Sequence, residues 1–258
     1  MLNYLRNLFS QSPKESLIGG RTAMLPSPAP VTAPSPVVMP APVVAHVPQA
    51  PPAPYENHLQ CAIAFTQSEG LRLDAPMWGN PTDNAQLSDI VAFISTGLDT
   101  QFALYRDRKF NVPMKLGGDC GNVHFLIASY IQKNNPGLEA NLVLGNVSVD
   151  GAGGFEFSQE KFKSWRRSGG HGAMYDCHSW ITFGDGMILD ATIATWVNTR
   201  RCSTKALGGI LYGMPGALSC IPITGEPHKT IPATTSVEYT PIALGIEAFL
   251  SVAPKKAP

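Results

Sequence analysis

The chain has 258 residues, 44% of them apolar and only 15% charged, and its 19 basic and 19 acidic residues give a formal net charge of zero. This length suits one domain of ordinary size plus an appendage. Without a basic excess the chain carries no electrostatic footprint for nucleic acid, so we expect no nucleic-acid partner. No apolar run approaches the roughly 18 residues that a membrane-spanning helix needs, so no membrane span is expected.

The N-terminal segment, residues 1–22, begins with Leu2, Leu5, Leu8 and Phe9 at helical spacing. This spacing favours a short amphipathic helix, with a disordered terminus as the alternative. The apolar stretch is too short and too interrupted to be the core of a secretory signal. We therefore expect a cytoplasmic protein, or one that is delivered by a route without a classical signal peptide.

Residues 23–55 read as a linker rich in Pro, Ala and Val, with eleven prolines between Pro26 and Pro54 and no charged residue. Each proline removes a backbone donor and fixes φ, which favours an extended spacer of polyproline II character over a helix or an inner strand. A proline-recognising protein is the partner that such a run suggests. Because the run cannot join a core, we expect residues 1–57 to be dispensable for folding.

A folded domain is expected over residues 56–252, with a flexible tail at 253–258. Apolar residues at three- and four-residue steps predict its first helices, and alternating or β-branched runs predict strands after them. The expected helices are 59–66, 87–106 and 117–134, and the expected strands are 141–149, 178–183, 187–192 and further short ones within 208–222 and 235–244. Helices followed by strands indicate an α+β fold with segregated layers.

The five cysteines are odd in number and include no Cys-x-x-Cys pair, which argues against a disulfide framework and against a zinc ribbon. We expect no metal and no cofactor; a metal site built from Cys120, Cys177, His171 and His178 lacks ligand-pair spacing. Free buried thiols are the interpretation for four of the five, which are Cys61, Cys177, Cys202 and Cys220.

Cys120 is the exception, because it stands where a helix is expected to begin, after Gly117-Gly118-Asp119. Asp119 is a candidate N-cap residue. The first amides of the helix would point toward the sulfur, favour the thiolate and offer donors to an oxyanion. This position predicts a nucleophile.

His178 and Asp190 are brought together by an expected hairpin over Gly184-Asp185-Gly186. In the register that this turn predicts, Phe183 faces Met187 and Trp180 faces Asp190. His178 and Asp190 then share a face as diagonal neighbours, about 7–8 Å apart at the backbone. The carboxylate can orient the imidazole and stabilise its charged form, which is the role of the third member of a catalytic triad.

These motifs resemble the transglutaminase-like superfamily. Gly118-Asp119-Cys120 with an apolar helix and the run Ala140–Gly145 are similar to its nucleophile region, and His178-x-Trp180, a glycine turn and Leu189-Asp190-Ala-Thr192 are similar to its histidine and aspartate region. The resemblance covers roughly residues 85–195. It implies a papain-like fold, with the nucleophile helix packed on an antiparallel sheet, and a Cys120–His178–Asp190 triad.

The activity that the resemblance implies is acyl transfer through a thioester, with a protein or peptide substrate. The superfamily includes thiol peptidases, amidases, deamidases and transglutaminases, so the choice between hydrolase and acyltransferase stays open. A non-enzymatic binding or structural protein that retains the fold is the alternative. A minor alternative is an arylamine N-acetyltransferase, because Gly117-Gly118-x-Cys120 looks like that family's motif, although Leu116 replaces the usual arginine.

The remaining candidates are weaker. His124 lies one helical turn after Cys120 and could pair with the thiol, but helix packing is the favoured interpretation. His171 is a candidate for the rim of the site, and Gln101 for the second oxyanion donor. Three tryptophans could line a substrate cleft or belong to the core: Trp78, Trp165 and Trp196.

Overall fold

The computed structural model of the protein describes residues 45–46, 55–105, 118–168, 176–202, 209–223 and 236–253. The expectations for the N-terminal segment, for most of the linker and for the tail concern residues outside these ranges. The helices are α3 (Tyr55–Ser68), α4 (Asn84–Tyr105), α6 (Cys120–Asn134), α7 (Gln159–Arg167), α8 (Ile193–Cys202) and α9 (Ile246–Val252), with a 3-10 turn at Pro136–Leu138.

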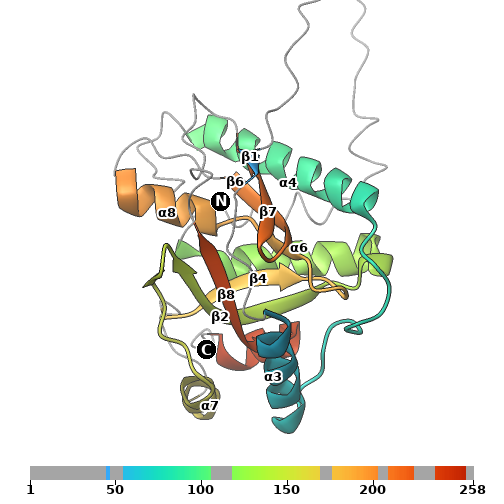
Figure 1. Cartoon of the computed structure of the whole chain (residues 1–258), viewed down its shortest axis with the longest axis vertical. Helices are drawn as coiled ribbons and strands as arrows, with labels where there is room; N and C mark the ends of the chain where they lie inside the picture. Colours follow the sequence, from blue (N-terminus) through green and yellow to red (C-terminus); the bar gives the residue numbers. More distant parts are fainter. Residues whose placement is uncertain are drawn as a thin grey trace, which may run out of the picture.

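The strands form one antiparallel sheet in the order β1-β7-β6-β5-β4-β2-β3, and β8 also pairs with β2. The strands are β1 (Ala45–His46), β2 (Asn141–Val149), β3 (Ala152–Gly153), β4 (His178–Thr182), β5 (Ile188–Asp190), β6 (Gly209–Met214), β7 (Ala217–Pro222) and β8 (Val237–Leu244). The predicted α+β class and the antiparallel sheet are confirmed. In the view of Figure 1 the strands β2, β4 and β8 cross the middle of the molecule, with α4 above them and α3, α7 and the red helix α9 below.

Strand β2 separates two apolar cores, because alternate side chains point to opposite faces of a strand. Leu142 and Leu144 belong to the core that also takes residues of α4, α6 and α9. Val143 and Val147 belong to the second core, with residues of α3 and α8. Helix α6 packs on β4 and β2. The helix that begins at Cys120 therefore lies directly against the strand that begins at His178.

The β4–β5 hairpin has the predicted register. The amide of Phe183 donates to the carbonyl of Met187 at 2.9 Å, and the paired residues are Ile181 with Leu189 and Thr182 with Ile188. Asp185 holds the hairpin tip, because its carboxylate accepts from the amide and the hydroxyl of Thr82 at 2.8 and 2.7 Å. The hairpin is thus anchored at its tip, and its other end is free to present His178 and Asp190.

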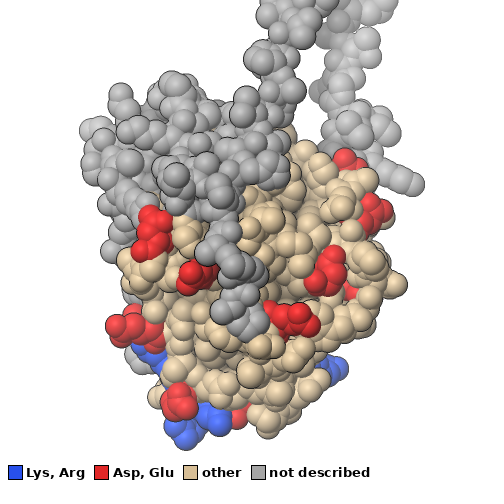
Figure 2. Space-filling view, in the orientation of Figure 1, with Lys and Arg blue, Asp and Glu red and all other residues tan. Residues whose placement is uncertain are grey.

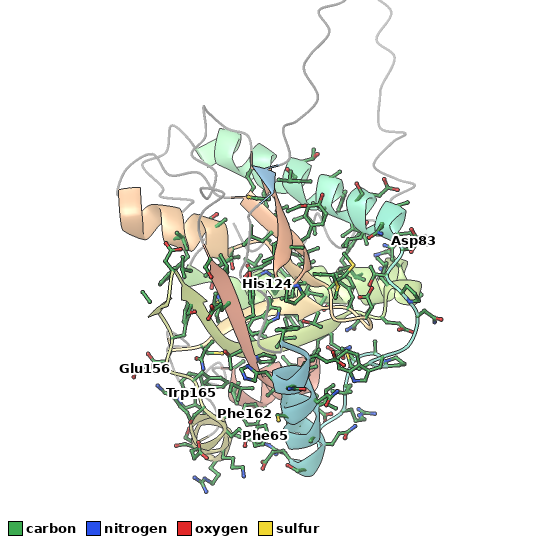
Figure 3. The ribbon with its side chains drawn as sticks, in the orientation of Figure 1. Phe65, Asp83, His124, Glu156, Phe162 and Trp165 are labelled. Atoms are coloured by element: carbon green, nitrogen blue, oxygen red, sulfur yellow. The ribbon has the colours of Figure 1, made fainter. Side chains whose placement is uncertain are left out.

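Helix α7 packs against α3 and α9, and Figure 3 shows the aromatic side chains at this contact. Phe162 and Trp165 are buried, and the Phe162 ring meets that of Phe65 edge-on at 5.5 Å. Trp165 is therefore a core residue rather than part of a substrate cleft. No helix in the part of the chain that the structure describes has the length and apolarity needed to cross a bilayer.

The outer face of α7 is basic, and Figure 2 shows Lys and Arg gathered at that end of the molecule. Glu69, just after α3, forms ion pairs with two of these residues, at 3.4 Å from Lys163 and 3.1 Å from Arg166. Lys161 pairs with Asp176 at 2.6 Å. Partly exposed pairs of this kind contribute little stability, so they mainly keep the local net charge low.

The linker meets the folded domain at two places. Ala45 and His46 of β1 pair with Cys220 and Ser219 at the edge of the sheet. Tyr55, the last linker residue of the sequence analysis, is the first residue of α3 and is only 6% exposed. Tyr55 is therefore part of the folded domain, and that the residues before it can be removed without loss of folding stays a prediction.

The hydroxyl of Tyr55 explains why this residue matters: it bonds the Thr182 hydroxyl at 2.5 Å and accepts from the Trp180 indole at 3.0 Å. We expect a chain that starts at Tyr55 to keep the stability of the full chain within about 1 kcal/mol. Tyr55→Phe should cost about 1–3 kcal/mol, because it leaves two buried polar groups with one partner fewer. Thermal melting of the two variants checks this; a large loss on removing residues 1–54, or none for Tyr55→Phe, contradicts it.

Candidate functional site

His178 and Asp190 are in direct contact. Nε2 of His178 lies 2.6 Å from Oδ2 of Asp190, and the two side chains are 1% and 0% exposed. The contact arises as the hairpin geometry predicts, because β4 begins at His178 and β5 ends at Asp190. A short bond between charged partners in a buried setting holds the imidazole ring in a single orientation.

The carboxylate of Asp190 has further partners on both oxygens. Oδ1 accepts from the amides of Thr192 and Ile193 at 2.9 and 3.0 Å, which are amides at the start of α8. Oδ2 also accepts from the hydroxyl of Tyr239 on β8 at 3.1 Å. Burial by itself would raise the pKa of Asp190, but the His178 charge and these donors hold it well below its usual range. Asp190 is therefore an anion throughout the ordinary pH range.

Cys120 begins α6 and is 8% exposed. Its Sγ lies 3.8 Å from the carbonyl oxygen of Cys177, the residue before His178. Asp119 stands at the N-cap position, but its side chain makes no capping hydrogen bond and instead accepts from the Asn122 amide group at 3.1 Å. Asp119 thus has the predicted N-cap position without a capping hydrogen bond, and its carboxylate does not compete for the first amides of the helix.

The charges of the site act on each other. Burial opposes ionisation of the Cys120 thiol, but the positive ring of His178 and hydrogen bonding from Ser179 outweigh it and lower the thiol pKa. Burial likewise disfavours the charged form of His178, but Asp190 and the Cys120 sulfur raise the pKa of the ring to about 10. These directions favour a thiolate beside an imidazolium over a thiol beside a neutral ring.

The second ring nitrogen of His178, Nδ1, is buried and has no hydrogen-bond partner among the residues that the structure describes. Nε2 is taken by Asp190, so Nδ1 is the nitrogen that remains to exchange a proton. Catalytic hydrogen bonds are often long in the absence of substrate. The unpartnered Nδ1 and the lowered thiol pKa of Cys120 are the features that chemistry at this site would use.

Aromatic rings enclose the imidazole. Trp180 stacks on the His178 ring at 6.1 Å and 18°, and Phe155 approaches the same ring at 5.2 Å. Gly145, which pairs with His178 across β2 and β4, makes room for this packing, because a Cβ there would lie 2.7 Å from the Trp180 indole. The rings exclude water from the His178–Asp190 contact and so strengthen it.

The three tryptophans of the sequence analysis have different places. Trp196 on α8 packs against Phe155 at 5.2 Å and so belongs to the surroundings of His178, whereas Trp165 is core. Trp78 is 45% exposed and its amide donates to Gly184 at the hairpin tip, at 2.7 Å. His171 and the side chain of Gln101 lie outside the described part of the chain.

Two residues next to the site, Tyr239 and His124, have contacts that the sequence did not predict. Tyr239 comes from a strand 49 residues after Asp190, and only the pairing of β8 with β2 brings it there. His124 does not pair with the thiol: its ring bonds the backbone on both sides, at Cys120 and at Ala191. For His124 the only signal in the sequence is its spacing of four residues from Cys120, which places both on one face of a helix. Nothing in the sequence indicates Tyr239.

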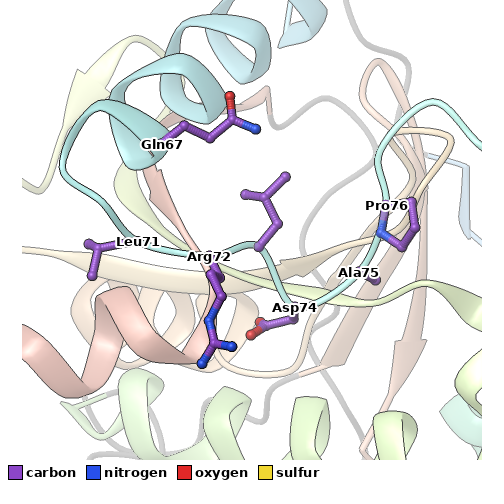
Figure 4. Close-up of a pocket in the computed structure, with 7 residues that line it drawn as sticks. Gln67, Leu71, Arg72, Asp74, Ala75 and Pro76 are labelled. Carbon is purple, nitrogen blue, oxygen red and sulfur yellow. The ribbon is translucent and has the colours of Figure 1, made fainter.

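A surface hollow of about 490 Å³ lies elsewhere, along residues 67 and 71–76 (Figure 4). Asp74 within it accepts from the amides of Ile246, at the start of α9, and Leu142. These bonds give Asp74 a structural task, and the hollow shares no residue with the candidate site. Within the described ranges, no group of three or more His, Cys, Asp or Glu side chains is arranged to hold a metal ion.

Comparisons with protein-family profiles, with curated proteins and with solved structures each found no match for this chain.

Proposed function

We propose that the protein is a thiol-dependent acyl-transfer enzyme in which Cys120 is the nucleophile, His178 the general base and Asp190 the residue that orients it. The observation that carries the proposal is the buried contact of 2.6 Å between His178 and Asp190. The other nitrogen of the same imidazole, Nδ1, has no partner among the described residues, and the charge of this ring lowers the pKa of the Cys120 thiol. A papain-like arrangement is part of the proposal; a helix that begins with the cysteine and packs on the antiparallel sheet supports it.

The proposed reaction proceeds in two halves. The Cys120 thiolate attacks the carbonyl carbon of an amide or ester, and the first amides of α6 face the developing oxyanion. The tetrahedral intermediate collapses to a thioester as the leaving amine or alcohol takes the proton from Nδ1 of His178. Water or an amine then attacks the thioester and gives its proton back to His178, and the thiolate leaves. Asp190 keeps its charge throughout.

The nature of the acceptor decides between the members of this reaction class. Water gives a peptidase, amidase or deamidase, and a primary amine gives a transglutaminase. The proposal favours hydrolysis of peptide or side-chain amides, with a protein or peptide as the substrate. A screen of amide and ester substrates, with and without an added primary amine, separates release of acid from transfer to the amine by mass spectrometry of the products.

Selective alkylation tests the activated thiol before any substrate is known. Cys61 is an exposed thiol on α3 and serves as the internal reference. At pH 6 an ordinary thiol is almost entirely protonated and reacts slowly. We therefore expect brief iodoacetamide treatment at pH 6 to label Cys120 about tenfold or more faster than Cys61, with the two rates converging toward pH 9. Peptide mapping after the labelling measures both.

The opposite labelling pattern would favour the non-enzymatic alternative. In a protein that merely retains the fold, Cys120 is a packed side chain that is 8% exposed. It would then react more slowly than Cys61 at pH 6 and at pH 8. That result would remove the activated thiolate and with it the proposed function.

A further inference from the structure

His124 is a buried imidazole that the proposed reaction does not use. It lies one turn after Cys120 on α6, is fully buried, and sits in the interior of the molecule (Figure 3). Both ring nitrogens have backbone partners: Nδ1 lies 2.9 Å from the carbonyl oxygen of Cys120, and the amide of Ala191 donates to Nε2 at 2.9 Å.

These two contacts determine where the proton of the ring is. A backbone amide can only donate, so Nε2 is the unprotonated acceptor and Nδ1 carries the hydrogen that is donated to Cys120. Burial, opposed by Asp190 and assisted by the charge of His178, lowers the pKa of His124 to about 4. Although Nε2 is 3.4 Å from Oδ1 of Asp190, it has no proton to offer, and His124 is neutral at the pH of any thiolate chemistry.

The partners of His124 belong to the two halves of the candidate site. One bond ends on the carbonyl of the candidate nucleophile and the other on the amide of the residue that follows Asp190. The ring also lies edge-on to that of His178, with the centroids 6.1 Å apart, and Ser179 Oγ is 3.5 Å from Nδ1. The neutral ring thus links the first turn of α6 to the end of β5 across the site.

We propose that His124 is a positioning residue that holds the Cys120 sulfur in register with the His178–Asp190 pair and thereby sets how much thiolate forms. This inference rests on the proposed function and assigns the residue that aligns it. His124 exchanges no proton with a substrate. It acts through the backbone of Cys120 and Ala191, so its loss should reduce the stabilisation of the thiolate by His178 without changing the identity of the nucleophile.

Two substitutions separate the two bonds. The amide of Asn can occupy the place of Nδ1 and still donate to Cys120, but it cannot reach Ala191. The amide oxygen of Gln can occupy the place of Nε2 and still accept from Ala191. Ile127→Ala is the control, because Ile127 is fully buried on the same helix and a cavity there lowers stability without opening either bond.

The measurement is the rate of Cys120 alkylation against pH, with thermal melting of each variant. We expect His124→Asn to raise the apparent pKa of Cys120 by about one unit or more, and so to slow alkylation at pH 6 about tenfold. Ile127→Ala should lower the melting temperature while the pH profile stays that of the native chain. His124→Gln, which keeps the bond to Ala191 and loses the one to Cys120, should also raise the apparent pKa of Cys120.

The outcomes distinguish this inference from the function on which it rests. If Cys120 of the native chain reacts no faster than Cys61 at pH 6, both the proposed function and the positioning role of His124 are contradicted. An activated native Cys120 whose pH profile is unchanged in His124→Asn would overturn the positioning role alone and leave His124 as a packing residue. If His124→Asn does not fold, His124→Gln decides, because a profile identical to that of the native chain would again contradict the role.

Discussion

Replacing Cys120 by alanine is expected to leave a folded protein and to remove turnover by about a thousandfold or more, once a substrate is identified. The fold should survive because the substitution deletes one sulfur atom at the start of α6, which already lacks a side-chain cap. Activity should not survive because the neighbouring thiol, that of Cys177, is buried and its pKa is raised well above its usual range, so it does not supply a thiolate in place of Cys120. Melting and turnover of the purified variant measure the two effects separately.

The matched control is Cys220→Ala, which removes another buried thiol from β7, outside the candidate triad, and should keep most of the turnover. Adding His178→Ala to Cys120→Ala should cost little more, because residues that act as one catalytic unit are strongly non-additive. Trapping a covalent acyl-enzyme on Cys120 would identify the intermediate directly. Near-normal activity of Cys120→Ala, or an adduct on one of the other four cysteines, would contradict the proposed nucleophile.

The contact between His178 and Asp190 could be predicted from the sequence because it depends on one local element. The Gly184-Asp185-Gly186 turn sets the hairpin, and a register slip by one residue would move every side chain to the other face. The observed pairing of Ile181 with Leu189 is the predicted one. The start of α6 at Cys120 was equally local, since the glycines and the apolar period after them mark a helix N-terminus.

The rest of the site could not be predicted because it depends on contacts between distant segments. Tyr239 reaches Asp190 only because β8 pairs with β2, and the order of strands in the sheet is not written in any single segment. Tyr55 was assigned to the linker because the proline run hides the start of α3. Helix α8 begins at Ile193, directly after the expected strand 187–192, and its apolar stripe is weak, so the sequence does not predict it.

Asp119 has the N-cap position but not the capping bond that its residue type favours. An aspartate directly before a helix is a strong N-cap signal, but Asn122 three residues later takes its carboxylate at 3.1 Å. The side chain therefore bonds another side chain instead of the backbone. For a nucleophile this is the more favourable arrangement, because a carboxylate bound to the first amides of α6 would oppose a thiolate there.

Asp190→Asn should lower turnover by on the order of a thousandfold while the protein stays folded. The asparagine oxygen is expected to remain with the amides of Thr192 and Ile193, which can only donate. Its NH₂ group then faces Nε2 of His178 and forces the ring proton onto Nδ1. In that tautomer Nδ1 can no longer accept a proton from the Cys120 thiol, and the imidazolium loses the carboxylate that stabilises it.

Asp190→Asn should also change the pH range in which the thiolate of Cys120 and the imidazolium of His178 coexist. Asp190 raises the pKa of His178, which stands at about 10, so its loss moves the alkaline limit of the imidazolium to lower pH. The charge of His178 lowers the pKa of Cys120, so a less charged ring moves the acidic limit of the thiolate to higher pH. The pH range in which thiolate and imidazolium coexist should therefore narrow from both sides, as alkylation and turnover profiles can measure.

Asp74→Asn is the control for Asp190→Asn, because Asp74 also accepts backbone amides at the start of a helix, α9, but lies outside the candidate site. Both variants replace a carboxylate that bonds buried or half-buried amides, and each should cost about 1–3 kcal/mol of stability. Only Asp190→Asn should change the pH profile of Cys120 alkylation. If the two variants lose stability alike and both retain native turnover on a validated substrate, Asp190 has the same structural task as Asp74, and the triad loses its third member.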